Sequence, residues 1–289
     1  MKRFEEMNPA AVAVYYLCVL AVTMFSMNPL LLAVALVTAV LSAAVSGTAS
    51  GRAHLFSAAV FVIAAVLNPL FVHKGMTVLF YLNDRPVTLE AVCYGLSAAA
   101  MITAALYRLR DLSKALSSDK VLYLFGRFSP KLALLLSMAI RYVALLRQRW
   151  RRISDAQRAL GLYDDGNLID ALRGRARVLS ILMTWTLENG IITAESMESR
   201  GYGCTRRTSY AVYHVRYPDV LLMLVCLLLT AVTVVGVQLS RVVYYPELDL
   251  ALFSPWGTAG AVAFTLLNVL PLLINLTEVI RWRSLRSKI

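Results

Sequence analysis

Residues 219–239 read DVLLMLVCLLLTAVTVVGVQL, with a single charged residue at the first position. A helix of this length rises about 30 Å, which matches the hydrocarbon thickness of a bilayer. Further apolar runs of similar length occupy residues 9–26, 28–46, 54–72, 88–107 and 256–280. The sequence therefore predicts an all-α, polytopic membrane helical bundle with about six spans.

The composition supports a membrane protein. The mean hydropathy is +0.65, and only 16% of the residues are charged, whereas soluble proteins have about a quarter. A pI near 9.8 could indicate nucleic-acid binding, but the sequence has no basic and aromatic recognition module. The positive charge lies beside the apolar runs, so membrane topology explains it better.

Most of the net charge lies in one stretch. Residues 108–218 hold 19 of the 29 Lys and Arg residues and 9 of the 17 Asp and Glu residues, which gives +10 of the chain's +12. If both termini are cytoplasmic, 26 of the 29 Lys and Arg residues fall on the cytoplasmic side, as the positive-inside rule requires. We therefore expect a four-span bundle over residues 1–107, a cytosolic region over 108–218, and two spans with a basic tail over 219–289.

The cytosolic region has the pattern of two long amphipathic helices. Apolar residues recur at helical spacing in two sets: Leu146, Trp150, Ile153 and Leu160, then Val178, Leu182, Trp185 and Ile192. The connection between them, residues 162–177, contains the turn sequence Asp164-Asp165-Gly166-Asn167 and a basic cluster formed by Arg173, Arg175 and Arg177.

The two predicted helices end alike. The first ends in Arg158-Ala159-Leu160-Gly161 and the second in Glu198-Ser199-Arg200-Gly201. A Gly after the last turn and a nearby cation are common at ordinary helix ends, because Gly accepts a left-handed cap and the cation favours the negative end of the helix dipole. The alternative is that Arg200 projects into a groove of a partner, where a guanidinium makes bidentate contacts. The near-repeat favours two similar docking sites.

Several motifs together resemble one family: the T component, or transmembrane coupling subunit, of energy-coupling-factor (ECF) transporters, which belongs to a cobalt-transport-type permease family. These transporters are bacterial ABC importers for vitamins and transition-metal ions. The motifs are Asn68-Pro69-Leu70-Phe71, Gly75, residues 77–80, Thr88-Leu89-Glu90-Ala91, Tyr94-Gly95, Arg141, Ala156-Gln157-Arg158-Ala159, residues 196–203 and Arg206-Arg207-Thr208.

The resemblance implies that each of two coupling-helix ends sits in a groove of an ATPase subunit. Ser199, Arg200 and Gly201 match one such motif. The other falls at Ala159, Leu160 and Gly161, where the family's usual Ala-Arg-Gly is replaced by Ala-Leu-Gly. Arg158 could substitute, but two residues along a helix is about 200° around its axis. Either the helix end unwinds there or this groove is engaged differently.

The resemblance further implies a non-catalytic subunit in the bacterial plasma membrane. Its partners would be two ATP-binding cassette subunits and one small substrate-binding membrane subunit that selects the cargo. The sequence contains no Walker-type phosphate-binding motif, so the ATPase must be another chain. No cofactor is expected. The cluster of Arg173, Arg175 and Arg177 is expected to contact anionic headgroups or a partner.

Two other functions fit the sequence less well. A permease or carrier that binds its substrate directly needs polar groups along its spans, which are few, and an inverted repeat is not detectable. A membrane-embedded enzyme needs clustered reactive groups, but the acidic residues inside the predicted spans, Glu90, Asp219 and Glu278, all lie near span ends.

Overall fold

The computed structural model forms two compact units: residues 1–121 with 213–289, and residues 122–212. The residues that it describes are 4, 7–47, 50–72, 75–82, 85–162, 168–204, 213, 215–240, 242–245, 249–250 and 255–286. This described part contains nine α-helices and two small antiparallel strand pairs. The predicted all-α membrane bundle is confirmed.

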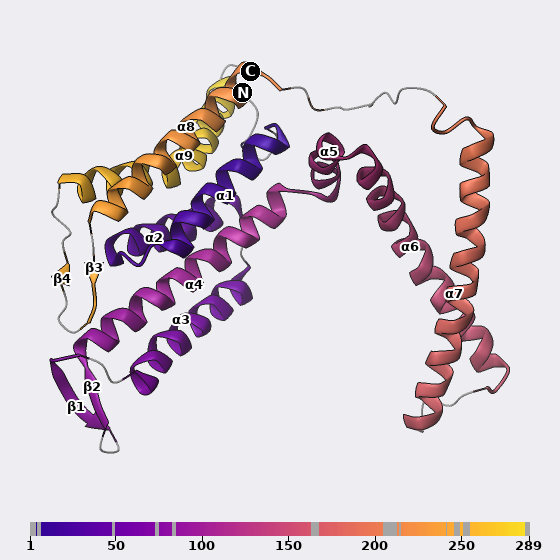
Figure 1. The fold of residues 1–289 in the computed structure, drawn as a ribbon, viewed down its shortest axis with the longest axis horizontal. Coiled ribbons are helices and arrows are strands. Elements are labelled where there is room, and N and C mark those ends of the chain that lie inside the picture. The colour runs from indigo at the N-terminus through magenta and orange to yellow at the C-terminus, as the bar shows by residue number, and fades with distance from the viewer. Residues whose placement is uncertain are drawn as a thin grey trace. The chain divides into compact units, whose positions relative to one another are not determined.

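The first unit is a helical bundle whose members lie alongside one another (Figure 1). Its helices are α1 (Pro9–Phe25), α2 (Pro29–Ser46), α3 (Gly51–Phe71), α4 (Leu89–Ala115), α8 (Tyr217–Leu239) and α9 (Pro255–Arg286). The same Asn-Pro dipeptide starts α1 and α2. The Asn8 and Asn28 side chains accept hydrogen bonds from the N–H groups of Ala10 and Leu30, and a proline at the first helical position loses no helical hydrogen bond.

Five helices of the described part are long and apolar enough to cross a membrane: α2, α3, α4, α8 and residues 255–275 of α9. Helix α1 is also apolar, but its 17 residues rise only about 26 Å. The chain is therefore a multi-pass membrane protein. The remaining predicted span, residues 9–26, corresponds to this shorter helix.

The fourth span extends further than the sequence predicted. We expected it to end at Tyr107, but α4 continues to Ala115. Arg108 and Asp111, which we assigned to the charged cytosolic stretch, are buried in the bundle with exposed fractions of 1% and 4%. Arg108 is buried there because its guanidinium finds hydrogen-bond acceptors inside the bundle.

A β-hairpin precedes α4, formed by β1 (Val78–Leu82) and β2 (Arg85–Thr88). Glu90 in the first turn of α4 fixes the base of the hairpin, because its Oε1 accepts hydrogen bonds from the Thr77 N–H (3.2 Å) and hydroxyl (2.7 Å).

A second, shorter pair, β3 (Val242–Val243) and β4 (Asp249–Leu250), lies between α8 and α9. Beside it, the Tyr244 hydroxyl donates to the Met27 carbonyl at 2.7 Å and lies 3.0 Å from Ser97 Oγ. Burial raises the pKa of this phenol. Tyr244 thus joins the α8–α9 connection to both α4 and the α1–α2 turn.

Helices α8 and α9 meet at two glycines, which gives a test of the packing. A Cβ on Gly236 would lie 2.7 Å from the Trp256 carbonyl oxygen and 2.8 Å from Gly260 Cα. Both are backbone atoms, so the helices would have to separate. We expect Gly236→Ala to destabilise the protein by about 1–3 kcal/mol, seen as a lower thermal unfolding midpoint in detergent.

Gly190→Ala is the matched control for this substitution. Gly190 also lies within a helix, but a Cβ there would have no neighbour within 4 Å. Alanine is a better helix former by about 1 kcal/mol, so this variant should unfold at the same or a higher temperature. Equal midpoints for the two variants would contradict the close approach of α8 and α9.

The second unit consists mainly of two long helices, α6 (Pro130–Ala159) and α7 (Leu168–Ser199), preceded by the short helix α5 (Ser118–Phe128). Helices α6 and α7 cross as an antiparallel pair (Figure 1). The turn predicted at residues 164–167 lies outside the described residues.

Candidate functional site

The crossing of α6 and α7 is held by polar and aromatic contacts. The Tyr142 hydroxyl lies 3.0 Å from Thr193 Oγ1 and donates to the Asn189 carbonyl at 3.4 Å. Further along α6, the Arg149 guanidinium lies 4.8 Å from the ring centroid of Trp185, a cation–π distance. These contacts join the two helices into one hairpin at the crossing.

The predicted amphipathic faces account for most of this contact. Val178 and Leu182 on α7 are buried, and Leu146, Trp150 and Ile153 on α6 are half-buried. The faces do not extend to the helix ends, because Ile192 is 55% exposed and Leu160 is 73% exposed. Leu160 is thus available to a partner.

Helix α7 ends at Ser199 and is followed by a Schellman cap in which Arg200 is the C-cap residue. Gly201 has a left-handed backbone (φ 73°), its N–H donates to the Glu198 carbonyl at 2.9 Å, and the Tyr202 N–H donates to the Met197 carbonyl at 3.0 Å. These are the two hydrogen bonds that define the motif. The cap places Arg200 directly after the last helical residue, with its side chain exposed.

Helix α6 ends in the same cap. Gly161 is left-handed (φ 65°), its N–H donates to the Arg158 carbonyl at 2.9 Å, and the Leu162 N–H donates to the Gln157 carbonyl at 3.1 Å. Both helices therefore stop by one mechanism, and the positive φ explains why each end carries glycine.

The matching hydrogen bonds align the two ends residue by residue. Leu160 occupies the position of Arg200, and Arg158 occupies that of Glu198. Helix α6 does not unwind before its cap, since it remains helical to Ala159. Arg158 is therefore not placed where Arg200 is placed, and the side chain presented at this end is apolar.

The two ends differ in what they can bind. Arg200 presents a guanidinium that makes bidentate hydrogen bonds to carboxylates or carbonyls. Leu160 offers only apolar surface, which gains free energy when a partner removes it from water. Arg158 in the last turn of α6 supplies a cation near the negative end of the helix dipole.

Arg173, Arg175 and Arg177 lie on α7 and are exposed. They belong to the first half of the helix, while Arg200 ends it, so the cluster lies about 35–40 Å from Arg200 along the axis. The structure does not bring these arginines to the Arg200 cap. Because α6 and α7 are antiparallel, the cluster lies toward the Leu160 end of the hairpin.

The sequence reasoning missed an exposed apolar stripe on α7. Its members are spaced four or seven residues apart on a face other than the buried one, and their exposed fractions are 88% for Leu168, 71% for Leu172, 48% for Leu179, 63% for Met183 and 71% for Leu187. We call this set the α7 stripe. The spacing is visible in the sequence as a second helical periodicity beside the one that we identified.

The motif residues Asn68, Pro69 and Gly95 lie where α3 packs against α4. Asn68 Nδ2 donates to the Ala91 carbonyl at 3.0 Å, and a Cβ on Gly95 would lie 3.0 Å from the Ala65 carbonyl oxygen and 3.2 Å from Pro69 Cδ. These residues therefore have a structural role in the bundle. Arg206, Arg207 and Thr208 lie outside the described residues.

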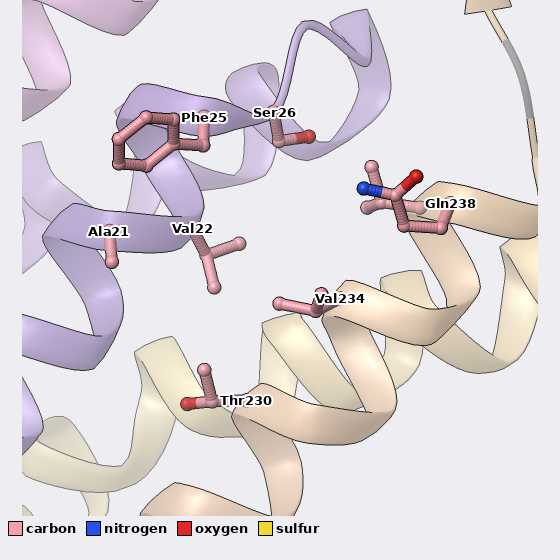
Figure 2. A pocket seen from close by; sticks show the side chains of 8 residues that line it. Ala21, Val22, Phe25, Ser26, Thr230, Val234 and Gln238 are labelled. Atoms are coloured by element: carbon pink, nitrogen blue, oxygen red, sulfur yellow. The ribbon is translucent and has the colours of Figure 1, made fainter.

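A pocket of about 270 Å³ opens between α1 and α8 (Figure 2). Its lining is mainly apolar, with polar groups only from Ser26, Thr230 and Gln238. None of the lining side chains is ionisable, so the pocket supplies no acid, base or charged ligand for a metal ion. It gives no support to direct substrate binding by charged groups or to catalysis.

Comparison with known proteins identifies relatives in one family. The model of the CbiQ family, described as cobalt transport protein, matches residues 4–211. The chain is 39% identical over 84 residues to the energy-coupling factor transporter transmembrane protein EcfT of Lactobacillus helveticus (strain DPC 4571), a match that covers 28% of this chain and 30% of that protein. It is 31% identical over 102 residues to EcfT 1 of Listeria monocytogenes serotype 1/2a (strain 08-5578), covering 35% of this chain and 38% of that protein.

A longer match includes the EcfT protein of Streptococcus equi subsp. equi (strain 4047), with 28% identity over 186 residues, 58% of this chain and 67% of that protein. The matches to the first two relatives span only about a third of their length. The family model covers more than half of this chain. The chain therefore belongs to the CbiQ family of cobalt transport proteins.

Proposed function

We propose that this chain is the transmembrane coupling subunit of an ECF-type ABC importer and that its two capped helix ends dock on two ATPase subunits. The observation that carries this proposal is the pair of matching Schellman caps, which present Arg200 and Leu160 at equivalent exposed positions. Ser199, Gly201, Ala159 and Gly161 complete the two docking ends. The names of the relatives support the same assignment.

The arrangement of the ends suits two separate partners. Because α6 and α7 are antiparallel, their C-terminal caps lie at opposite ends of the hairpin. The 32 residues of α7 correspond to about 48 Å, which is too far for both caps to enter one groove. Closure of two ATPase subunits around ATP would then move both ends of one rigid hairpin.

The movement would reach a small substrate-binding membrane subunit through the α7 stripe. An apolar stripe of this length is costly to leave in water and marks an interaction site. An integral membrane subunit has apolar surface to match it. The cargo, a vitamin or a transition-metal ion, would be bound by that subunit and not by this chain.

The topology that fits this role has both termini in the cytoplasm of a bacterial cell. The distribution of Lys and Arg favours it, with 26 of 29 on that side. In this orientation, Arg173, Arg175 and Arg177 would contact anionic headgroups, each contributing about 1 kcal/mol near the surface.

Co-purification with a variant of the α7 stripe tests the proposal. The wild-type chain, co-expressed with two ATPase subunits and a small membrane subunit from its own genome, should purify with all three. Leu172→Asp/Leu179→Asp places two carboxylates in the stripe, so we expect the small subunit to be lost while both ATPases are retained. Quantitative mass spectrometry of the purified complexes measures this.

Thr184→Asp is the control, because Thr184 is also exposed on α7 but lies roughly 120–140° around the helix axis from Leu172 and Leu179. It should leave the complex intact. Loss of the small subunit in the control as well would show that any added charge on α7 has this effect. Failure of the wild-type chain to retain ATPases would contradict the proposed function itself.

A further inference from the structure

The last turns of α4 make polar contacts with the helices around it. The Tyr107 hydroxyl lies 2.8 Å from His54 Nδ1 on α3. Arg110 Nη1 donates to the Ala53 carbonyl, also on α3, at 3.0 Å. Arg108 points the other way, toward α2 and α9. These contacts gather at the end of α4 from which the chain continues into α5 and the second unit.

Arg108 is the centre of a buried network. Its Nη2 donates to Asn268 Oδ1 on α9 at 2.8 Å and to Thr38 Oγ1 on α2 at 3.2 Å. Its Nη1 donates to Ser42 Oγ on α2 at 3.2 Å, and the Ser42 hydroxyl in turn donates to Asp111 Oδ2 at 2.9 Å. Arg108 is only 1% exposed and Asn268 is fully buried.

A charged side chain inside a membrane bundle is costly, and such residues generally serve a function. The planar guanidinium fixes three acceptors in one geometry, which a lysine ammonium cannot do. Elsewhere, α4 presents small buried residues to its neighbours, such as Ala91, Ala99 and Ala104. Small residues let helices approach closely, but they provide little directional resistance to sliding. The buried directional contacts of α4 with α2 and α9 come from Arg108 and Asp111, while the exposed Lys114 Nζ donates to the Ser46 carbonyl at the end of α2.

We propose that Arg108 is a positioning residue that clamps the outgoing end of α4 to α2 and α9. Movement of the α6–α7 hairpin reaches the bundle through α5 and the end of α4, because the chain is continuous there. With the clamp intact, α2, α4 and α9 shift together; without it, α4 moves without α2 and α9, and less of the movement reaches them. This inference rests on the proposed coupling function.

An apolar replacement of the network separates coupling from stability. Replacing buried charges by apolar residues often leaves stability unchanged or raises it, whereas removing one partner alone is costly. We therefore choose Arg108→Met/Asp111→Leu, assembled with both ATPases and the small subunit in proteoliposomes. ATP hydrolysis is measured together with uptake of radiolabelled Co²⁺, Ni²⁺, biotin or riboflavin, whichever the wild-type complex accumulates.

We expect the double variant to assemble and hydrolyse ATP, with uptake per ATP reduced about threefold to thirtyfold, the range of known coupling effects. Arg52→Met is the control, since Arg52 is exposed at the start of α3, and it should leave the ratio unchanged. A normal ratio in the double variant would overturn the proposal.

If the double variant does not assemble, Arg108→Lys decides. Lysine keeps the positive charge but lacks the planar guanidinium with its several donors, so the uptake per ATP should still fall. A wild-type value of uptake per ATP in this variant would overturn the proposal. A wild-type chain that retains no ATPase subunits points to a failure of the proposed function instead. The two failures are therefore distinguishable.

Discussion

Arg200→Ala should abolish most ATP-driven uptake while ATP hydrolysis by the partner subunits continues. The cap holds the Arg200 guanidinium at the exposed end of a rigid helix, and a hydrogen-bonded charge in a partner's groove is worth about 2 kcal/mol, or about 30-fold in affinity. Alanine preserves the helix and the cap, so only the contact is removed. Uptake and ATP hydrolysis measured in proteoliposomes provide the test.

Arg158→Ala is the matched control for Arg200→Ala. Arg158 lies in the helical position that corresponds to Glu198, two residues before the cap position. Its removal should therefore reduce uptake by less than about threefold, the size of a typical surface effect. Equal losses of uptake in the two variants would mean that Arg158 binds one ATPase groove as Arg200 binds the other, despite its different position on the helix.

Leu160→Asp should release one ATPase subunit from the complex and leave the other bound. Leu160 stands at the position of Arg200 and is 73% exposed, so we expect its groove to be apolar. Burying an unpaired carboxylate there costs at least about 2 kcal/mol. The composition of the purified complex, measured by native mass spectrometry, reports the loss of a single subunit.

Leu160→Met tests whether shape and polarity explain that effect. Methionine has a similar volume and is apolar, and such exchanges usually cost less than about 1.5 kcal/mol. This variant should retain both ATPases. Retention of both subunits by Leu160→Asp as well would show that this end does not dock through residue 160.

The secondary structure of α6 and α7 could be predicted because the sequence signals for these helices are local. The apolar spacing of Val178 and Leu182 on one face is a property of a few consecutive turns, and these residues do face α6. The helix ends could also be predicted from the sequence, since a Schellman cap needs a residue with positive φ and glycine occupies that position at Gly161 and Gly201. The family resemblance inferred from the motifs is confirmed.

The limits of the sequence are clearest at Arg108. Beside Tyr107 at the end of an apolar run, an arginine is expected to face water, and nothing nearby in the sequence indicates otherwise. Its acceptors Ser42, Thr38 and Asn268 lie 66, 70 and 160 residues away. A buried charge is tolerated only where such partners meet, and their meeting is not encoded in any local pattern.

The sequence alone determined that this protein crosses the membrane repeatedly and that two amphipathic helices end in glycine caps, because hydropathy, helical periodicity and capping act within one helix. Only the tertiary structure decided that Arg108 lies inside the bundle, that α6 and α7 cross as one hairpin, and that the α7 stripe faces away from α6. These features depend on residues distant in sequence coming into contact, and that contact sets which charges find partners and which apolar faces stay open.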